Sequence, residues 1–139
     1  MKKILVLLLP LLTLVACQDQ VQQIAGTYSY KISGTAIVDG DERTLTDEMG
    51  ALDIIHVDST TAMLTFNALN GPAYVTEAEI HGQNIELKEY ERVITVLTTD
   101  YHVTASGQGT VYDQTILIHL SYEGTDFQAD ELTLLCKKN

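Results

Sequence analysis

The segment that decides the fold is YHVTASGQGTVYDQTILIHLSY, residues 101–122. On either side of the dipeptide Asp113-Gln114, apolar and polar residues alternate with a period of two. This period is typical of a strand with one buried face, and the dipeptide is typical of a turn. Because so short a link cannot hold a crossover helix, the two strands must run antiparallel. The segment therefore predicts a β-hairpin.

The same alternation continues in both directions along the chain. It predicts eight strands near residues 27–38, 43–57, 61–69, 73–80, 85–97, 101–112, 115–122 and 127–136. Short turn segments rich in Gly, Asp and Asn separate them, so sequential strands are expected to pair as an antiparallel meander. Such a meander most simply closes into an all-β up-and-down barrel, because closure removes exposed strand edges. A two-sheet sandwich is the alternative.

Glycines inside the expected strands indicate where the sheet departs from regularity. Gly34, Gly50, Gly107 and Gly109 fall inside strand patterns, where glycine is typical of bulges or sharp bends. The alternation also changes phase near residues 89–91, which indicates a bulge. Long strands need bends of this kind in order to close a barrel.

The beginning of the chain resembles the export signal of a bacterial lipoprotein. A basic head, Met1-Lys2-Lys3, precedes an apolar run that ends in Leu14-Val15-Ala16-Cys17, and this tetrapeptide resembles a lipobox. The apolar run is about a dozen residues long, shorter than the ~20 that a spanning helix needs. The resemblance implies that cleavage occurs before Cys17, that its thiol carries a diacylglycerol and that its new amino group is acylated. Several buried acyl chains make a durable membrane anchor.

This resemblance also implies a domain organisation and a location. It divides the chain into a signal peptide, residues 1–16, a lipidated tether, residues 17–23, and a barrel domain, residues 24–139. The residue after the cysteine is Gln18 rather than Asp, which implies the outer membrane of a bacterial cell envelope. We therefore expect the protein to contact the membrane through Cys17.

The acidic balance of the chain excludes one class of partner and favours another. The chain has 8 Lys and Arg against 19 Asp and Glu, a net charge of −11. Loss of Lys2 and Lys3 with the signal leaves 6 basic residues and a net charge of −13. Nucleic acid is excluded as a partner, because phosphate binding needs clustered Lys and Arg. A basic protein partner would be attracted by the same charge.

The pentapeptide Ile24-Ala25-Gly26-Thr27-Tyr28 resembles the first-strand signature of the lipocalins and the wider calycin superfamily, where Gly-x-Trp lies at the barrel base. Together with the meander and the lipobox, it makes the chain similar to the small calycin-like lipoproteins of the Bacteroidetes. The chain departs from the lipocalin pattern in having no Trp and no Arg after Arg92. The resemblance implies a small calycin-like barrel on a lipid anchor.

The inner face of the expected barrel supplies the candidate ligand-binding residues. Eight strands leave room for packed side chains or for one small ligand. The apolar rows that the alternation selects contain Tyr28, Tyr30, Tyr101, Val103, Ile116, Ile118 and Leu120. We therefore expect a non-enzymatic protein that binds a small apolar or amphipathic ligand. The alternative is a protein-interaction module, such as an inhibitor of a lysozyme or protease or a subunit of an envelope complex.

Patterns for other chemistry are weaker. No Ser-His-Asp or Cys-His order can be assembled, so we assign no catalytic residue and expect no cofactor. Asp53, His56 and Asp58 come nearest to a metal site, but in a strand Asp53 points away from the other two, and we assign no metal ligand. Cys136 alternates with leucines and is expected in the core. The tripeptide Asp58-Ser59-Thr60 matches the O-glycosylation sequon of the Bacteroidetes, which implies a glycan on Ser59.

Overall fold

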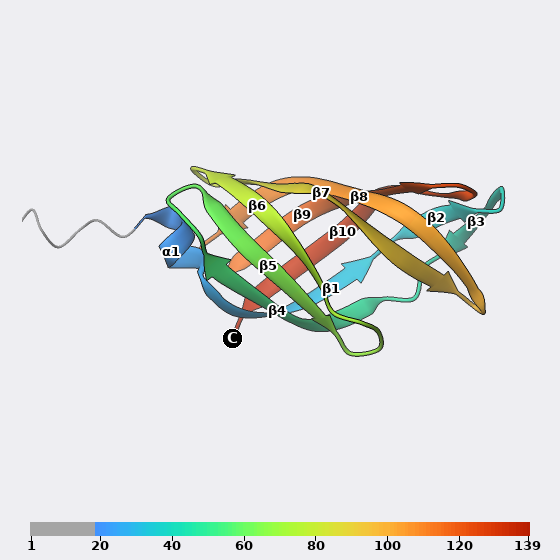
Figure 1. Cartoon of the computed structure of the whole chain (residues 1–139), viewed down its shortest axis with the longest axis horizontal. Helices are drawn as coiled ribbons and strands as arrows, with labels where there is room; N and C mark the ends of the chain where they lie inside the picture. The colour runs from blue at the N-terminus through green and yellow to red at the C-terminus, as the bar shows by residue number, and fades with distance from the viewer. Residues whose placement is uncertain (1–18) are drawn as a thin grey trace, which may run out of the picture.

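The computed structural model describes residues 19–139, and these residues form one short helix and ten strands (Figure 1). The elements are α1 Gln20–Ile24, β1 Gly26–Ser33, β2 Thr35–Val38, β3 Asp41–Thr44, β4 Glu48–His56, β5 Thr61–Ala68, β6 Tyr74–His81, β7 Asn84–Val96, β8 Thr99–Tyr112, β9 Thr115–Gly124 and β10 Phe127–Lys138. The expected all-β class is confirmed. In the described part of the chain, no helix is long and apolar enough to cross a membrane.

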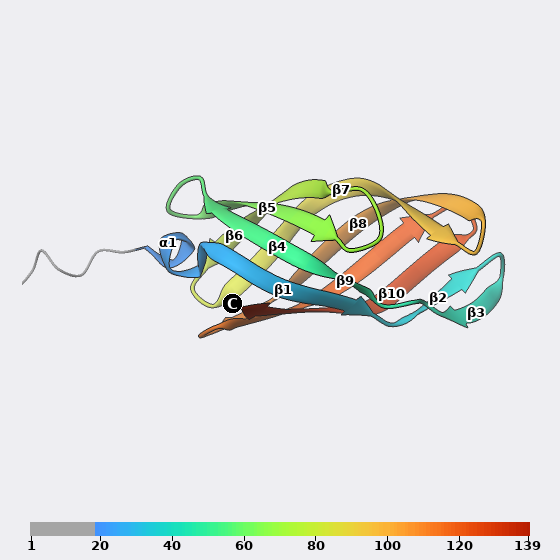
Figure 2. The same ribbon diagram turned by 90° about the horizontal axis from the view of Figure 1, so that it is seen from below.

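Eight of the strands close into an antiparallel barrel (Figure 2). They follow one another in the order β1-β4-β5-β6-β7-β8-β9-β10, and the pairing of β1 with β10 completes the ring. The hairpin expected over residues 101–122 is β8 and β9, which pair from Val103 and Gly124 to Tyr112 and Thr115. The up-and-down barrel is therefore confirmed, and the two-sheet sandwich is wrong.

Two of the predicted strands are each divided in the structure. Residues 27–38 form β1 and β2, which separate at Gly34, and residues 43–57 contain parts of β3 and β4. Gly34 has a φ of +147°, which only glycine adopts readily, so the expected bend at this position is confirmed. Beyond it, β2 and β3 form a hairpin outside the barrel, attached through pairing of β2 with Phe127 and Gln128 of β10. The sheet consequently has ten strands rather than eight.

The expected bulge in residues 89–91 is confirmed within β7. The register between β7 and β8 shifts between Leu87 and Tyr90. Pairing of β7 with β6 ends at the same place, where Leu87 faces Ala78. Beyond it, the Thr76 hydroxyl donates to the carbonyl oxygen of Lys88 at 2.9 Å. The two strands therefore diverge toward the end of the barrel at which β6 begins.

Three glycines mark places where strands approach closely. Gly50 and Gly109 lie in ladders without a register shift, so a bulge at these two positions is wrong. Gly107 faces Leu87, where the register shift between β7 and β8 begins. A Cβ added to Gly109 would overlap the carbonyl oxygen of Leu117, and one added to Gly50 would overlap that of Asn67. The absence of a side chain is thus what lets the neighbouring backbone pass.

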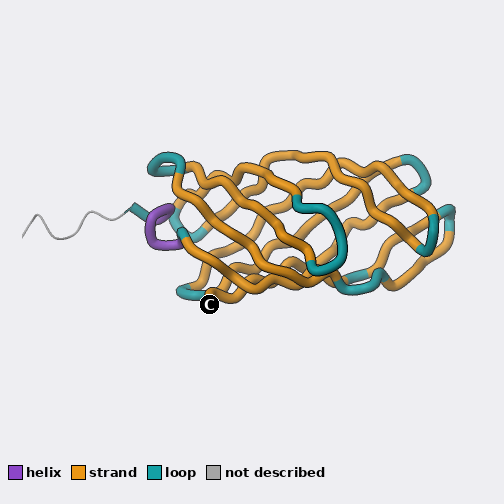
Figure 3. Tube along the Cα trace, turned by 60° about the horizontal axis from the view of Figure 1, so that its bottom comes forward, coloured by secondary structure: helices purple, strands orange, loops and turns teal. Residues whose placement is uncertain are grey.

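Helix α1 covers one end of the barrel (Figure 3). It begins with a capping box, in which the Asp19 side chain accepts from the Gln22 backbone N–H at 2.8 Å. Val21 and Ile24 are buried in the core that fills the barrel. The folded domain therefore starts before Ile24, the boundary expected from the sequence. We call residues 19–25, which form and cap α1, the plug; residues 20–23 belong to it and are not a free tether.

Candidate functional site

The seven predicted ligand-binding residues all lie on the inner face of the barrel. Their side chains are buried, with relative exposures between 0% and 8%. They are distributed along the whole barrel: the Tyr28 hydroxyl donates to the carbonyl oxygen of Ile24 in the plug, whereas the Tyr101 hydroxyl donates to Asp39 Oδ2 in the β2–β3 hairpin. The structure therefore places them in the packed core and does not bring them together as one site. Their binding of a ligand stays a prediction.

A buried ion pair lies inside the barrel at the end away from α1. Arg92, on β7, holds Glu48, at the start of β4, with a two-pronged contact: Nη2 to Oε1 at 2.6 Å and Nη1 to Oε2 at 3.3 Å. The two side chains are only 12% and 22% exposed. Two charges removed from water in this way are stable only when further hydrogen bonds satisfy them.

Tyrosine hydroxyls supply those hydrogen bonds. Tyr74 and Tyr30 donate to Glu48 Oε2 at 2.6 Å and 3.1 Å. Arg92 Nη1 in turn donates to the hydroxyl oxygens of Tyr74 and Tyr122 at 2.8 Å and 3.1 Å. The five residues come from β1, β4, β6, β7 and β9, so the cluster ties together strands on opposite sides of the barrel.

Aromatic rings form the walls of this cluster. The Phe66 ring lies edge-on to Tyr30, with centroids 5.1 Å apart, and stacks on Tyr74 at 4.8 Å. Tyr74 also stacks on Tyr90 at 5.8 Å. The guanidinium carbon of Arg92 lies 4.2 Å from the centre of the Tyr74 ring, which is close enough for a cation–π interaction. The rings leave the guanidinium little freedom to move.

The charges of the cluster stabilise each other against burial. Burial favours the neutral acid of Glu48, but the hydrogen bonds and charge of Arg92, with the tyrosine hydroxyls, hold its pKa below the ordinary value of 4.5. Burial likewise opposes the charge of Arg92, yet Glu48 keeps its pKa above the ordinary range. Burial raises the pKa of Tyr122 to about 12. At neutral pH the cluster is therefore a carboxylate and a guanidinium among neutral phenols.

One donor in this cluster, the buried Arg92 Nε, has no hydrogen-bond partner among the described residues. The buried Tyr90 hydroxyl lies against that of Tyr122. Because Glu48 occupies the Nη1–Nη2 side of the guanidinium, the Nε side is the one left for another acceptor. Unsatisfied buried donors cost free energy, so a site that keeps them invites a functional explanation.

The cluster lies where the barrel opens toward solvent. Along the inner face of β7, Ile85 and Leu87 are buried, whereas Arg92, Ile94 and Val96 are partly exposed. The hairpins β2–β3, β7–β8 and β9–β10 extend past the β5–β6 loop at this end (Figures 1 and 2). We call this region the barrel mouth. It is defined by six partly exposed residues, Leu45, Glu48, Tyr74, Arg92, Ile94 and Val96.

Acid should lower the free energy of unfolding by protonating Glu48. The pKa of Glu48 lies below 4.5 in the folded protein and near 4.5 in the unfolded chain, so the unfolded chain binds more protons. Its contribution to stability is then complete above about pH 4.5 and is lost as the pH falls through the folded-state pKa. The free energy of unfolding, measured with urea from neutral to acidic pH, should fall more steeply for the wild type than for Glu48→Gln. Parallel curves would contradict this prediction.

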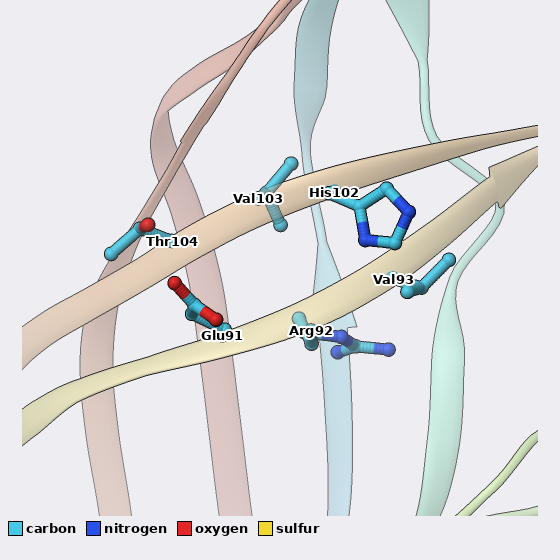
Figure 4. A pocket seen from close by; sticks show the side chains of 6 residues that line it. All are labelled: Glu91, Arg92, Val93, His102, Val103 and Thr104. Atoms are coloured by element: carbon cyan, nitrogen blue, oxygen red, sulfur yellow. The ribbon is translucent and has the colours of Figure 1, made fainter.

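Two hollows of the surface lie mainly on the outer face of the strands. A shallow hollow of about 330 Å³ on β7 and β8 has six lining residues, Glu91, Arg92, Val93, His102, Val103 and Thr104 (Figure 4). Four of these alternate onto the outer, exposed face of the strands, and Arg92 and Val103 onto the inner face. A smaller hollow of about 100 Å³ lies on the carboxylate-rich surface of β5, β6 and β7. Of the seven predicted residues, Val103 alone lines either hollow.

The remaining predicted sites fall in different places. Cys17 lies outside the described residues, so its lipidation stays a prediction. Ser59 is exposed in the β4–β5 turn, where Asp58 Oδ1 accepts from the Thr60 and Thr61 backbone N–H groups, and its glycosylation stays a prediction. His56 lies 3.1 Å from Asp19 and not with Asp53 or Asp58.

The described His, Cys, Asp and Glu side chains form no metal-binding group. Among residues 19–139, no group of three or more His, Cys, Asp and Glu side chains could hold a metal ion. Cys136 is fully buried, and burial raises the pKa of its thiol to about 12, so it belongs to the core as expected.

Sequence reasoning missed the Arg92–Glu48 cluster. One signal was present: Arg92 shares an alternating row with Tyr90, Ile94 and Val96, so it is a charged residue on an apolar face. Such a residue needs a partner, but nothing local identified Glu48, which is 44 residues away. Comparison of the chain with protein-family models, curated proteins and solved structures finds no match.

Proposed function

We propose that the protein is a lipid-anchored lipoprotein of the bacterial envelope, whose barrel binds a small amphipathic ligand at its mouth without catalysis. The observation that carries the proposal is the buried Arg92–Glu48 cluster, which keeps an unpartnered donor at the one end of the barrel that α1 does not cover. Ligand sites are typically apolar concavities with a few placed polar groups. The mouth combines partly buried apolar side chains with a few placed polar groups.

The composition of the mouth favours an amphipathic ligand over a purely apolar one. Leu45, Ile94 and Val96 are partly buried apolar side chains packed against the core, and they would contact an apolar body. The Nε of Arg92 would donate to a polar head. Because the inner residues closer to α1 are fully packed, such a ligand would occupy the mouth rather than the length of the barrel.

Binding of the amphipathic dye anilinonaphthalene sulfonate tests this proposal. We expect saturable fluorescence with the mature wild-type domain and several-fold weaker binding after Ile94→Glu on the inner face of β7. The matched control is Val93→Glu, which adds the same charge to the outer face of the same strand and should leave binding unchanged. Thermal unfolding confirms that each variant is folded, and Val96→Glu provides a second inner-face variant. Absence of saturable binding, or equal losses for both faces, would contradict the proposal.

Lipidation has its own test. In a bacterial host that processes lipoproteins, the N-terminal peptide should begin at Cys17 and carry the mass of the acyl groups. The wild type should fractionate with membranes, and Cys17→Ser should not, because one hydroxyl cannot replace a thioether-linked diacylglycerol. A free thiol at Cys17, or an uncleaved leader on the mature protein, would contradict the anchor.

A second candidate function is docking of a basic protein. Leu97, at the tip of the β7–β8 hairpin, is 84% exposed and has a φ of +59°, an unusual combination for leucine. Leu69, in the β5–β6 loop, is 72% exposed. The nearby β2–β3 hairpin carries Asp39, Asp41 and Glu42, which would attract a basic surface. Salt-sensitive binding of a partner that is lost in Leu97→Ser, without saturable dye binding, would favour this alternative.

A further inference from the structure

The described chain enters the fold at the end of the barrel that α1 covers. Three contacts from different strands hold the plug in place. Asp19 Oδ2 lies 3.1 Å from His56 Nε2 of β4, the Tyr28 hydroxyl of β1 donates to the Ile24 carbonyl oxygen at 2.7 Å, and Lys138 Nζ of β10 donates to the Gln23 carbonyl oxygen at 3.1 Å. With Val21 fully buried as well, the plug is part of the rigid barrel.

Cys17 is separated from Asp19 by one residue, Gln18. Consecutive Cα atoms are 3.8 Å apart, so two peptide units can span at most about 7.6 Å. Acyl chains on Cys17 would therefore hold the plugged end of the barrel next to the lipid headgroups. With so short a connection in the sequence, the plugged end could not move far from the membrane.

The plugged end carries side chains that suit a membrane surface. Ile55, Val57 and Tyr112 are each more than half exposed at this end, on β4, at the start of the β4–β5 turn and at the end of β8. Aliphatic and tyrosine side chains of this kind favour the membrane–water interface. Lys137 and Lys138 lie at the same end, in the last residues of β10, and oppose the charges of the turn carboxylates Asp58 and Asp113.

The opposite end carries a cluster of negative charge. Six carboxylates lie in or beside its hairpin turns, Asp39, Asp41, Glu42, Asp100, Glu123 and Asp126, with Arg43 as the basic residue of the β2–β3 hairpin. Anionic lipid headgroups would repel this end. Charge and covalent attachment therefore favour the same orientation.

We infer that the plugged end is a membrane-contact surface, which seats the barrel on the bilayer with its mouth directed into the aqueous phase. This inference rests on the proposed lipidation of Cys17. It adds a defined orientation that a lipid anchor alone does not impose. A ligand or partner would then reach the mouth from the aqueous side.

An environment-sensitive fluorophore tests the orientation in the full lipidated protein, placed in nanodiscs of phosphatidylcholine and phosphatidylglycerol. Labels are attached at Gln114→Cys, in the β8–β9 turn of the plugged end, and at Thr98→Cys, in the β7–β8 turn of the mouth end. Cys136 is fully buried and should not react. We expect lipid-borne quenchers to reduce the signal at position 114 several-fold more than at position 98. A Gly-Ser linker inserted between Gln18 and Asp19 should reduce this difference.

The outcomes separate the orientation from the anchor. The acyl mass on Cys17 is measured on the same sample. If the mass is present and both labels are quenched equally, or position 98 more strongly, the orientation is wrong and the anchor stands. If the mass is absent, the anchor and the orientation are both wrong.

Discussion

Replacing Arg92 by Met should lower the free energy of unfolding by about 3 kcal/mol, because it leaves a buried carboxylate without its counter-charge. Glu48 would keep the hydroxyl contacts of Tyr30 and Tyr74 but lose the bidentate contact and the nearby positive charge. The Arg92 guanidinium carbon also lies 4.2 Å from the centre of the Tyr74 ring and 5.6 Å from that of Tyr122, so the loss includes cation–π contacts as well as the ion pair. Urea denaturation at neutral pH measures the change.

The double variant separates the charge pair from the packing. Glu48→Gln with Arg92→Met should recover part of the loss, because the uncompensated charge is removed. The exposed pair Lys88–Glu77 provides the matched control: its atoms are 3.5 Å apart and its side chains 74% and 43% exposed. Lys88→Met should change stability by less than about 0.5 kcal/mol. Equal effects at Arg92 and Lys88 would show that the buried pair has no special role.

Gly109→Val should be the most damaging single substitution in the barrel wall. Its Cβ would overlap the carbonyl oxygen of Leu117 on β9, and backbone atoms in a closed ladder cannot move aside without opening hydrogen bonds. We expect a loss of at least about 3 kcal/mol, at the upper end of overpacking effects. Soluble expression and the midpoint of thermal unfolding are the measurements.

The neighbouring position supplies the control for the glycine. Gln108 lies beside Gly109 in β8, is exposed and faces His119 in a regular register. Gln108→Val adds the same residue on the outer face and, since valine favours strands, should leave stability nearly unchanged. A folded Gly109→Val with wild-type stability would mean that β8 and β9 are farther apart than the structure places them.

The strands were predictable because each has one buried face, and the alternation records that face. The hairpin of β8 and β9 follows directly from the Asp113-Gln114 turn and the apolar rows on either side. The β2–β3 hairpin was not predictable in the same way. Gly34 indicated a bend, but a bend inside the barrel and an exit from the barrel have the same local sequence; the pairing of β2 with Phe127 decides between them.

The plug and the cluster escaped prediction for different reasons. A helix of five residues is too short for a helical period, although Asp19 and Gln22 have the spacing of a capping box. Arg92 and Glu48 meet because β4 and β7 face each other across a closed barrel, and strand alternation gives a residue's face without giving its partner across the interior. Because alternation does give the face, the seven predicted ligand-binding residues were correctly placed on the inner side of the barrel. The divergence of β6 from β7 at the barrel mouth depends on tertiary structure and has no local sequence pattern.

A two-dimensional NMR titration of the mature domain with anilinonaphthalene sulfonate locates the binding site directly. We expect saturable shifts of the Arg92 Nε–H resonance and of the backbone amides of Leu45, Tyr74, Ile94 and Val96. Amides of the plug at the other end, such as Val21, should not move. No saturable shift, or shifts centred on the outer-face residues Val93 and His102, would contradict the claim that the mouth is the binding site.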